Sequence, residues 1–266
     1  MQALIPFPEI SPEIFVVPLF GMEFALRWYA LAYIAGIIIA WRLVVGAVRR
    51  PALWPGAAAP MTEKQVEDLV TWIIIGIIIG GRLGYVLFYN PGYYLQNPEA
   101  ILRVWDGGMA FHGGLIGVIL ATWIFASRAG IPKLCLGDAL AFSAPAGLML
   151  GRLANFINGE LWGRPTDVPW AVIFPSMCRN SALQGCAKVG AWFYTGAEVP
   201  RHPSQLYQAG LEGLLLGMVL LYLVYRRGAL RAPGRVMGVF FAGYGTARFV
   251  VEFVRQPDAQ FAGPGN

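Results

Sequence analysis

Long apolar runs alternate with short polar segments along this chain, as is typical of a protein that crosses a membrane several times. A helix needs about 20 mainly apolar residues to cross the hydrocarbon core. Prolines, glycines and charges between the runs predict the helix ends. The pattern therefore predicts an all-α polytopic membrane protein, a bundle of about six transmembrane helices over Ala30–Val48, Val66–Tyr89, His112–Ala126, Gly137–Leu150, Leu206–Tyr225 and Val236–Val254.

The composition places the chain outside the soluble class. It is 57% hydrophobic and 13% charged, with a mean hydropathy of +0.56. A net charge of +5 would suggest nucleic acid in a soluble protein, but here the cations cluster between the apolar runs, so we expect no nucleic-acid partner. Because basic loops stay on the cytoplasmic side, the cations after the first, third and fifth runs predict a periplasmic N-terminus.

The start of the chain and its cysteines set further limits. The first cation is Arg27 and four prolines precede it, so we predict no cleavable signal and a first span that directs its own insertion. The three cysteines and two histidines lack the spacing of a zinc site, so we expect no metal and no cofactor. Cys178 and Cys186 are predicted to form a disulfide, the alternative being two free thiols.

The second apolar run carries Gly76, Gly80 and Gly84 at four-residue spacing, which places them on one helix face. Small residues on one face let neighbouring helix backbones approach closely, so we predict a helix-packing seam. Arg82 interrupts the same run. An arginine inside a span either lines a cavity or pairs with a carboxylate of another helix, and the second interpretation is favoured here.

Two polar motifs lie within or at the end of later runs. Arg152 and Asn155, three residues apart, share a helix face. An arginine costs roughly 2.5–3.5 kcal/mol at the centre of a span, so it usually faces a polar cavity or an anion; the alternative is an arginine that reaches out to the headgroups. In the sixth run Tyr244, Arg248 and Glu252 recur every four residues, as a functional stripe or as an Arg–Glu pair that neutralises itself.

A third motif begins at His112, which opens the third run and precedes Gly113 and Gly114. The free amides of a helix N-terminus attract anions and glycines allow close approach, so a bound phosphate is one interpretation. The other is a histidine that caps the helix and hydrogen-bonds Asp106. The longest polar stretch, 158–203, predicts a small lobe outside the membrane, and Glu212 in the fifth run receives no role.

Four segments carry a resemblance to one family. They are GRLANFINGELWGR from Gly151, FHGGL from Phe111, RHPSQLYQAGLEG from Arg201 and GYGTARFVVEFVRQPDAQF from Gly243. In content and order they resemble the signature of the prolipoprotein diacylglyceryl transferases, and the resemblance covers most of the chain. The family typically continues into a seventh span, whereas this chain stops at Asn266.

The resemblance implies an enzyme of bacterial lipoprotein maturation in the cytoplasmic (inner) membrane. Such an enzyme transfers the diacylglyceryl group of phosphatidylglycerol to the lipobox cysteine thiol of a prolipoprotein, forming a thioether and releasing glycerol 1-phosphate. It implies one membrane-embedded transferase domain over 1–266, with 158–203 as a periplasmic lobe and the active site towards the periplasm. The expected partners are phosphatidylglycerol, prolipoprotein signal peptides with a lipobox cysteine, and membrane lipids.

The family motifs also imply roles for single residues. Arg152 and Arg248 are expected to hold the phosphodiester, because a guanidinium binds phosphate bidentately and stays charged at low dielectric. His112 is the expected base for the thiol. The catalytic set is His112, Arg152, Arg248, Tyr244 and Glu252, and the substrate-binding set is Tyr29, Gly113, Gly114, Asn155, Asn158, Glu160, Gly163 and Arg164.

Alternatives stay open at three points. Arg82 or Arg164 would hold the phosphate if the two expected arginines do not, and Glu252 or Glu160 would replace the histidine as base. A transporter or channel would also carry arginines in its spans, although the sequence contains no internal repeat. A membrane hydrolase would need a two-aspartate, Gly-x-Ser-x-Gly or metal-ligand pattern, and none stands out.

Overall fold

The computed structural model describes residues 5–19, 22–175 and 187–256. Within them, five helices are long and apolar enough to cross a membrane, so the predicted class of polytopic helical membrane protein is confirmed. They are α1 (Trp28–Val48), α2 (Glu63–Phe88), α4 (Phe111–Ala129), α5 (Lys133–Ile157) and the continuous helix Ser204–Arg227, formed by α6 (Ser204–Gln208), the π-helical segment η5 (Ala209–Leu215) and α7 (Leu216–Arg227).

The sixth predicted span is helix α8 (Arg235–Glu252), which is 18 residues long and carries three charged residues. The long helices turn large apolar side chains outward: Ile79 of α2, Ile119 of α4 and Phe249 of α8 are 54%, 55% and 67% exposed. Contiguous apolar area of this kind is rare on soluble monomers and matches a surface that faces acyl chains.

The chain folds into two compact units, which are described separately. The first comprises Met1–Ala40, Ala141–Leu223 and Gly238–Asn266, and the second comprises Trp41–Leu140 and Val224–Met237. Helices α1, α5, α7 and α8 each contribute residues to both units. The candidate residues on α5, α7 and α8 belong to the first unit, whereas those at the start of α4 belong to the second.

In the second unit, helices α2 and α4 pack along the glycine seam predicted from the sequence. A β-carbon at Gly76 would lie 2.6 Å from the carbonyl oxygen of Gly117 and 2.8 Å from Ala121 Cβ. One at Gly84 would lie 2.7 Å from Gly113 Cα. All three distances are shorter than van der Waals contact, so the helix backbones approach as closely as glycine permits and the seam is confirmed.

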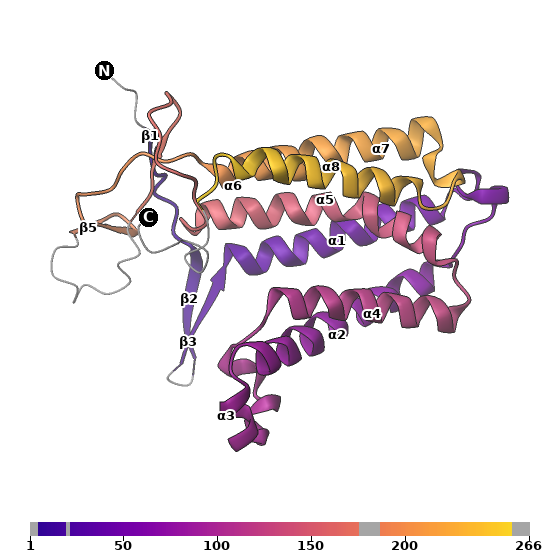
Figure 1. Ribbon diagram of the computed structural model, residues 1–266, viewed down its shortest axis with the longest axis horizontal. Helices are drawn as coiled ribbons and strands as arrows, with labels where there is room; N and C mark the ends of the chain where they lie inside the picture. The colour runs from indigo at the N-terminus through magenta and orange to yellow at the C-terminus, as the bar shows by residue number, and fades with distance from the viewer. Residues whose placement is uncertain (1–4, 20–21, 176–186, 257–266) are drawn as a thin grey trace. The chain divides into compact units, whose positions relative to one another are not determined.

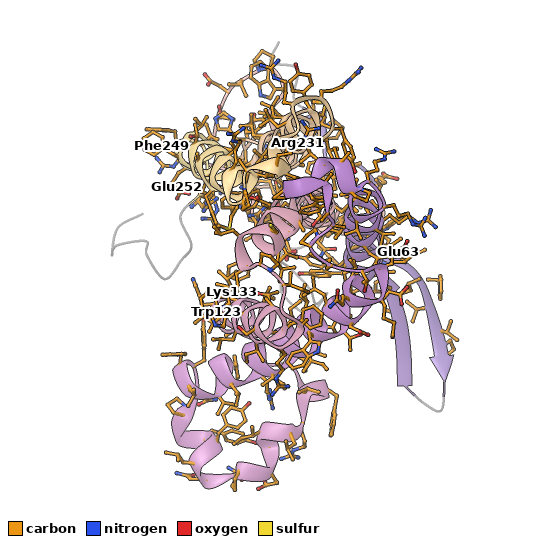
Figure 2. All side chains as sticks on the ribbon, turned by 90° about the vertical axis from the view of Figure 1, so that its right-hand side faces the viewer. Glu63, Trp123, Lys133, Arg231, Phe249 and Glu252 are labelled. Carbon is orange, nitrogen blue, oxygen red and sulfur yellow. The ribbon has the colours of Figure 1, made fainter. Side chains whose placement is uncertain are left out.

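Short helices connect the spans of the second unit, and two contacts fix its helix ends. Lys133 Nζ lies 3.8 Å from the centre of the Trp123 ring, and the two side chains are neighbours in Figure 2. The buried Asp138 carboxylate accepts the backbone N–H groups of Gly234 and Met237 at the start of α8. The connecting elements are η1 (Pro51–Leu53), η2 (Pro55–Ala57), α3 (Pro91–Gln96), η3 (Pro98–Leu102), η4 (Val104–Asp106) and η6 (Ala229–Arg231).

In the first unit, helix α5 packs against both α1 and the Ser204–Arg227 helix, and α8 packs against α7 (Figure 1). A β-carbon at Gly36 of α1 would lie 3.1 Å from Gly147 Cα of α5. One at Gly243 of α8 would lie 2.6 Å from the Leu216 side chain of α7. Close packing of these helices gathers their polar residues in one unit.

Short strands form the lobe and the N-terminal segment of the first unit. Strand β1 (Ile5–Pro6) pairs in parallel with β4 (Val172–Ile173), and β5 (Ala187–Val189) pairs with β6 (Trp192–Tyr194) in antiparallel fashion. Phe7 packs in one buried cluster with Val172 and Phe174. The N-terminal segment therefore belongs with the lobe, which the sequence had limited to 158–203.

An antiparallel hairpin of β2 (Glu13–Leu19) and β3 (Met22–Arg27) precedes α1. Sequence analysis assigned only a proline-rich start here, because Pro12 and Pro18 interrupt a short β-branched run. The Arg27 and Glu13 side chains form an ion pair of 3.0 Å across the hairpin. The hairpin leads directly into α1, so it positions the first turn of that helix, which contains Tyr29.

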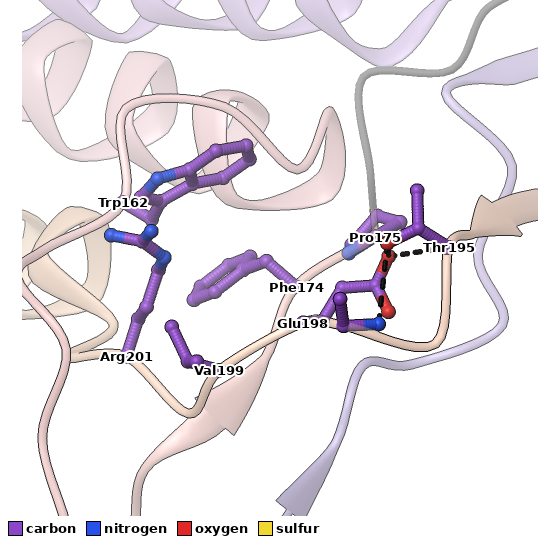
Figure 3. A pocket seen from close by; sticks show the side chains of 8 residues that line it. Trp162, Phe174, Pro175, Thr195, Glu198, Val199 and Arg201 are labelled. Atoms are coloured by element: carbon purple, nitrogen blue, oxygen red, sulfur yellow. Dashed lines mark hydrogen bonds between the residues drawn. The ribbon is translucent and has the colours of Figure 1, made fainter.

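Figure 3 shows a pocket in the lobe with an aromatic wall. The Arg201 guanidinium lies 5.6 Å from the centre of the Trp162 ring. The Glu198 carboxylate accepts hydrogen bonds from the backbone N–H groups of Thr195 and Gly196, so these bonds stabilise its own loop. The lining residues are Trp162, Phe174, Pro175, Thr195, Ala197, Glu198, Val199 and Arg201. The predicted Cys178–Cys186 disulfide lies outside the described residues.

Candidate functional site

The end of helix α5 is shaped by a glycine turn that returns the chain onto the helix. Gly159 has φ +63°, its N–H donates to the Phe156 carbonyl, and the Glu160 N–H donates to the Asn155 carbonyl. This pair of bonds is the Schellman arrangement, which requires a residue in the left-handed region. The turn places the Glu160 side chain beside the helix end that it has just left.

The returned Glu160 carboxylate joins a partly buried polar network. Its Oε1 accepts from Asn155 Nδ2 at 3.0 Å and from Asn158 Nδ2 at 3.3 Å. Asn155 Nδ2 also donates to the Tyr29 hydroxyl at 2.8 Å, and Gln205 donates to the Glu160 carbonyl. The structure therefore brings together four of the predicted substrate-binding residues, from α1, the end of α5 and the turn that follows.

Arg152, one helical turn before this network, pairs with a residue that sequence analysis left without a role. Its Nε lies 3.8 Å from Glu212 Oε2, and the Glu212 side chain is completely buried. Neither oxygen of Glu212 has a hydrogen-bond partner among the described residues. The sequence did carry a signal for this role, because Glu212 lies in the middle of an apolar span. Burying a carboxylate there costs free energy unless a cation accompanies it.

Two further arginines pair with Glu252 of α8. Arg248 Nη2 and Arg255 Nη1 lie 3.0 Å and 3.8 Å from Glu252 Oε2, and both arginines lie near enough to Glu212 to interact with it electrostatically. The Arg248–Glu252 pair expected from the four-residue spacing is therefore present. Arg248 Nη1 is buried and has no hydrogen-bond partner in the described part of the chain.

We call Arg152, Arg248, Arg255, Glu212 and Glu252 the arginine cluster. Its three guanidiniums outnumber its two carboxylates, so the cluster is positively charged. A positive cluster favours an anion, and a phosphodiester is one. Tyr244, one turn before Arg248 on α8, stacks on Phe240 with ring centres 5.9 Å apart. Glu252 and Phe249 are labelled on α8 in Figure 2.

Gly163 and Arg164 tie the lobe to the end of α8. The N–H groups of Gly163 and Arg164 donate to the carbonyls of His202 and Val254, and Arg164 Nε donates to the Arg255 carbonyl at 2.9 Å. A β-carbon at Gly163 would lie 2.5 Å from the Val254 carbonyl oxygen, so this position needs glycine. These contacts give both residues a role in holding the backbone that carries Arg255.

His202 lies in the same connection. Its Nδ1 lies 3.2 Å from the Tyr207 hydroxyl, which also accepts from Trp170 Nε1 at 2.7 Å. Burial lowers the pKa of His202 below its usual value. The imidazole is therefore held in its neutral form near pH 7.

His112 lies in the second unit, as the second residue of α4. It is exposed and its ring meets the Phe111 ring edge to face at 5.6 Å. Helix α4 begins after Ala110 and has no side-chain cap, so the histidine does not cap it. Gly113 is buried in the seam with α2, and Gly114 is only partly buried. A β-carbon at Gly114 would lie 3.8 Å from the Ile77 carbonyl oxygen.

Arg82 is buried in α2 and uses all its donors on the loop that precedes α4. Sequence analysis favoured a carboxylate partner, and that prediction is wrong: within the described ranges the partners are backbone carbonyls. A guanidinium has five N–H groups, and each has an acceptor here, so none remains for a ligand. The acceptors are the carbonyls of Ala100, Ile101, Arg103, Gly107 and Gly108.

No group of three or more His, Cys, Asp or Glu side chains could hold a metal ion within residues 5–19, 22–175 and 187–256. Cys135 is buried and has a free thiol. The described site offers guanidiniums, carboxylates, amides and a phenol.

Known proteins match the chain over nearly its whole length. A family model described as prolipoprotein diacylglyceryl transferase matches residues 17–265. Proteins named phosphatidylglycerol--prolipoprotein diacylglyceryl transferase are similar to it: that of Ruegeria pomeroyi is 64% identical and that of Roseobacter denitrificans 60% identical, each over 266 residues. Both alignments cover 100% of this chain and 87% of the relative. The chain therefore belongs to the prolipoprotein diacylglyceryl transferase family and is a transferase.

Proposed function

We propose that this protein transfers the diacylglyceryl group of phosphatidylglycerol to the thiol of the lipobox cysteine in a prolipoprotein signal peptide. The products are a thioether and glycerol 1-phosphate, and the reaction is the first step of lipoprotein maturation. The observation that carries the proposal is the arginine cluster, in which Arg152 pairs with the buried Glu212 and Arg248, from a different helix, pairs with Glu252. Family membership and the names of the relatives agree with this assignment.

The chemistry requires an anion site because the bond that breaks joins carbon to a phosphate oxygen. The cysteine sulfur forms a bond to the terminal glyceryl carbon, and the phosphate leaves with the electron pair. Charge therefore grows on the leaving phosphate, and a guanidinium aimed at it stabilises the transition state. The unpaired Nη1 of Arg248 is a donor suited to this role.

The neighbouring network would orient the lipid headgroup. Asn155 donates to both the Tyr29 hydroxyl and the Glu160 carboxylate, so the geometry of the three side chains is fixed before substrate binds. Asn158 and Tyr244 complete the set around the clamp. Gly163 and Arg164 act by fixing the backbone of the lobe beside Arg255.

The base that takes the thiol proton is proposed to be His112, with Glu252 and Glu160 as alternatives. Glu252 and Glu160 are each engaged, the first with two arginines and the second with two amides, which favours the exposed histidine. Replacing His112 by Gln keeps a hydrogen-bond donor but removes the proton acceptor. If His112 is the base, the Gln variant should lose most of its activity. If the activity survives, the base is one of the two carboxylates. Gly114, which is only partly buried, would leave its amide at the start of α4 open to the substrate, and Gly113 would act by packing that helix start against α2.

The proposed setting is one membrane-embedded domain over 1–266 in the cytoplasmic (inner) membrane, with 158–203 as a periplasmic lobe. The basic residues Arg226, Arg227, Arg231 and Arg235 support a periplasmic N-terminus and a site towards the periplasm. Single cysteines introduced at the lobe and at 226–235 would be labelled from opposite sides by a membrane-impermeant thiol reagent. Labelling of 226–235 from the periplasm would contradict this orientation.

The function is tested with purified protein, phosphatidylglycerol and a synthetic lipobox peptide, read by mass spectrometry. The peptide should gain the mass of one diacylglyceryl group, and glycerol 1-phosphate should appear in equal amount. A peptide with serine in place of the cysteine is the matched control and should remain unmodified. Absence of the adduct, with transport of lipid across vesicles instead, would support the transporter alternative.

A further inference from the structure

We infer that Glu212 is a positioning residue for the reaction, and that it acts by holding Arg152 in the orientation that binds the lipid phosphate. The inference rests on the proposed function, because it takes Arg152 as one arm of the phosphate clamp. Glu212 is completely buried, whereas the Arg152 side chain is 23% exposed. The carboxylate therefore contacts the arginine and the arginine contacts accessible space.

The backbone around Glu212 brings the carboxylate against α5. Glu212 lies in the π-helical segment η5, the only such segment among the residues described. A β-carbon at the next residue, Gly213, would lie 2.7 Å from Met149 Cα, so η5 touches α5 one turn before Arg152. A π-helical turn adds a residue and redirects the side chains within it. Glycine and the π turn together place this carboxylate beside Arg152.

The geometry of the pair leaves the phosphate-binding edge of Arg152 free. The approach to Glu212 is through Nε at 3.8 Å, on the inner side of the guanidinium, rather than through the terminal nitrogens. A guanidinium can form a bidentate contact along either of two edges, and the edge between its two terminal nitrogens is the one that this pair does not use. The carboxylate thus attracts the Nε side of Arg152 and leaves the other edge for a phosphate.

The charge of Glu212 also keeps the arginines together. Without it, Arg152 would lose its ion-pair partner, and repulsion by the charges of Arg248 and Arg255 at low dielectric would turn Arg152 away from them. Neither Glu212 oxygen has a hydrogen-bond partner in the described ranges, so the carboxylate is bound by charge and is not part of a hydrogen-bonded structural network. An unsatisfied buried carboxylate of this kind calls for a functional explanation.

The test is a double-mutant cycle in the full chain, with kcat and KM for phosphatidylglycerol measured by peptide mass shift. Glu212→Gln keeps shape and removes the charge, and we expect kcat/KM to fall about 100-fold, the cost of misplacing a binding group by about 1 Å. In an Arg152→Gln background, the same change should cost less than about threefold. Equal losses in both backgrounds would overturn the inference, because Glu212 would then act without Arg152.

Matched variants separate this role from folding and from failure of the clamp. Asp138→Asn makes the same chemical change at an equally buried carboxylate that binds backbone amides, and it should lower thermal stability while the rate per folded molecule stays within about threefold. If Glu212→Gln does not fold, Glu212→Asp retains the charge and should fold with a loss of activity that again disappears in the Arg152→Gln background. Full activity of Arg152→Gln alone would refute the clamp itself, and not only its positioning.

Discussion

Two regions of this molecule each contain arginine inside an apolar helix, and their surroundings differ. Arg82, in the second unit, is 4% exposed and every N–H of its guanidinium has a backbone carbonyl as acceptor. In the first unit, Arg248 has a buried nitrogen without a partner, and Arg152 faces a carboxylate that accepts no hydrogen bond. One arginine is saturated by protein, and two keep binding capacity.

The protein offsets the free-energy cost of an arginine inside an apolar helix in two different ways. Backbone carbonyls satisfy the donors of Arg82 and at the same time close the loop that precedes α4. Carboxylates neutralise the charge of the arginine cluster but leave donors unused. We conclude that unused donors, and not the presence of arginine alone, distinguish a binding site from a structural one.

The largest expected effect follows replacement of an arginine with unused donors. Arg248→Gln should lower transfer by two to three decades, since loss of one charged donor to a transition-state oxyanion costs roughly 2.7–4 kcal/mol. Arg248→Lys should recover little of this, because lysine restores charge without the planar fork. Transfer rates per inserted molecule measure the effect. Near-normal turnover of Arg248→Gln would mean that another residue holds the phosphate, and the exposed Arg164 is the next candidate.

Replacement of the saturated arginine should act on stability instead. Arg82→Gln leaves several buried or partly buried carbonyls without donors and should lower the free energy of unfolding by on the order of 3 kcal/mol. Thermal unfolding in detergent measures this directly. Arg248→Gln, assayed alongside, should unfold within a few degrees of the wild type. A reversal, in which Arg248→Gln is the unstable variant, would break the distinction between the two regions.

The helix that carries Arg82 offers a smaller test of how tightly its unit is packed. Gly76→Ala would place a methyl group 2.6 Å from the Gly117 carbonyl oxygen and should cost roughly 1–3 kcal/mol by overpacking. Gly147→Ala is the matched control, because a β-carbon there meets nothing within 4 Å. The control should be neutral or slightly stabilising, as expected for alanine in a helix. Equal unfolding temperatures for both variants would contradict the seam.

The smallest expected effect concerns pH and the connection beside the arginine cluster. Burial lowers the pKa of His202 in the folded protein, so the unfolded chain binds its proton more readily. Stability should therefore fall as pH decreases below about 6.5, the unperturbed value, and the loss should level off below the folded pKa. His202→Gln should remove this part of the pH dependence of the unfolding temperature. An unchanged pH profile would mean that another group titrates.

The sequence predicted those features that depend on periodicity. Apolar length marked the spans, four-residue spacing gave the glycine seam, and the same spacing gave the Arg248–Glu252 pair. Motif recognition supplied the family and the residues of the α5 end.

Features that depend on backbone acceptors or on contacts between distant elements were missed. Carbonyl oxygens have no sequence signature, so the partners of Arg82 went unrecognised. The partner of Glu212 could not be predicted from the sequence, because a pair of residues 60 positions apart leaves no local pattern. The pair forms only where η5 packs on α5. The hairpin before α1 was missed because prolines obscured two short strands.

The most direct test of the account measures which lipid the arginine cluster holds. Binding of phosphatidylglycerol and of diacylglycerol with the same acyl chains is compared by native mass spectrometry for the wild type, the Arg152→Gln, Arg248→Gln double variant and Arg82→Gln. We predict that the wild type prefers phosphatidylglycerol, that the double variant loses about 10- to 100-fold of this preference, as expected for charged hydrogen bonds, and that Arg82→Gln keeps it. An unchanged preference in the double variant, or its loss in Arg82→Gln, would contradict the account.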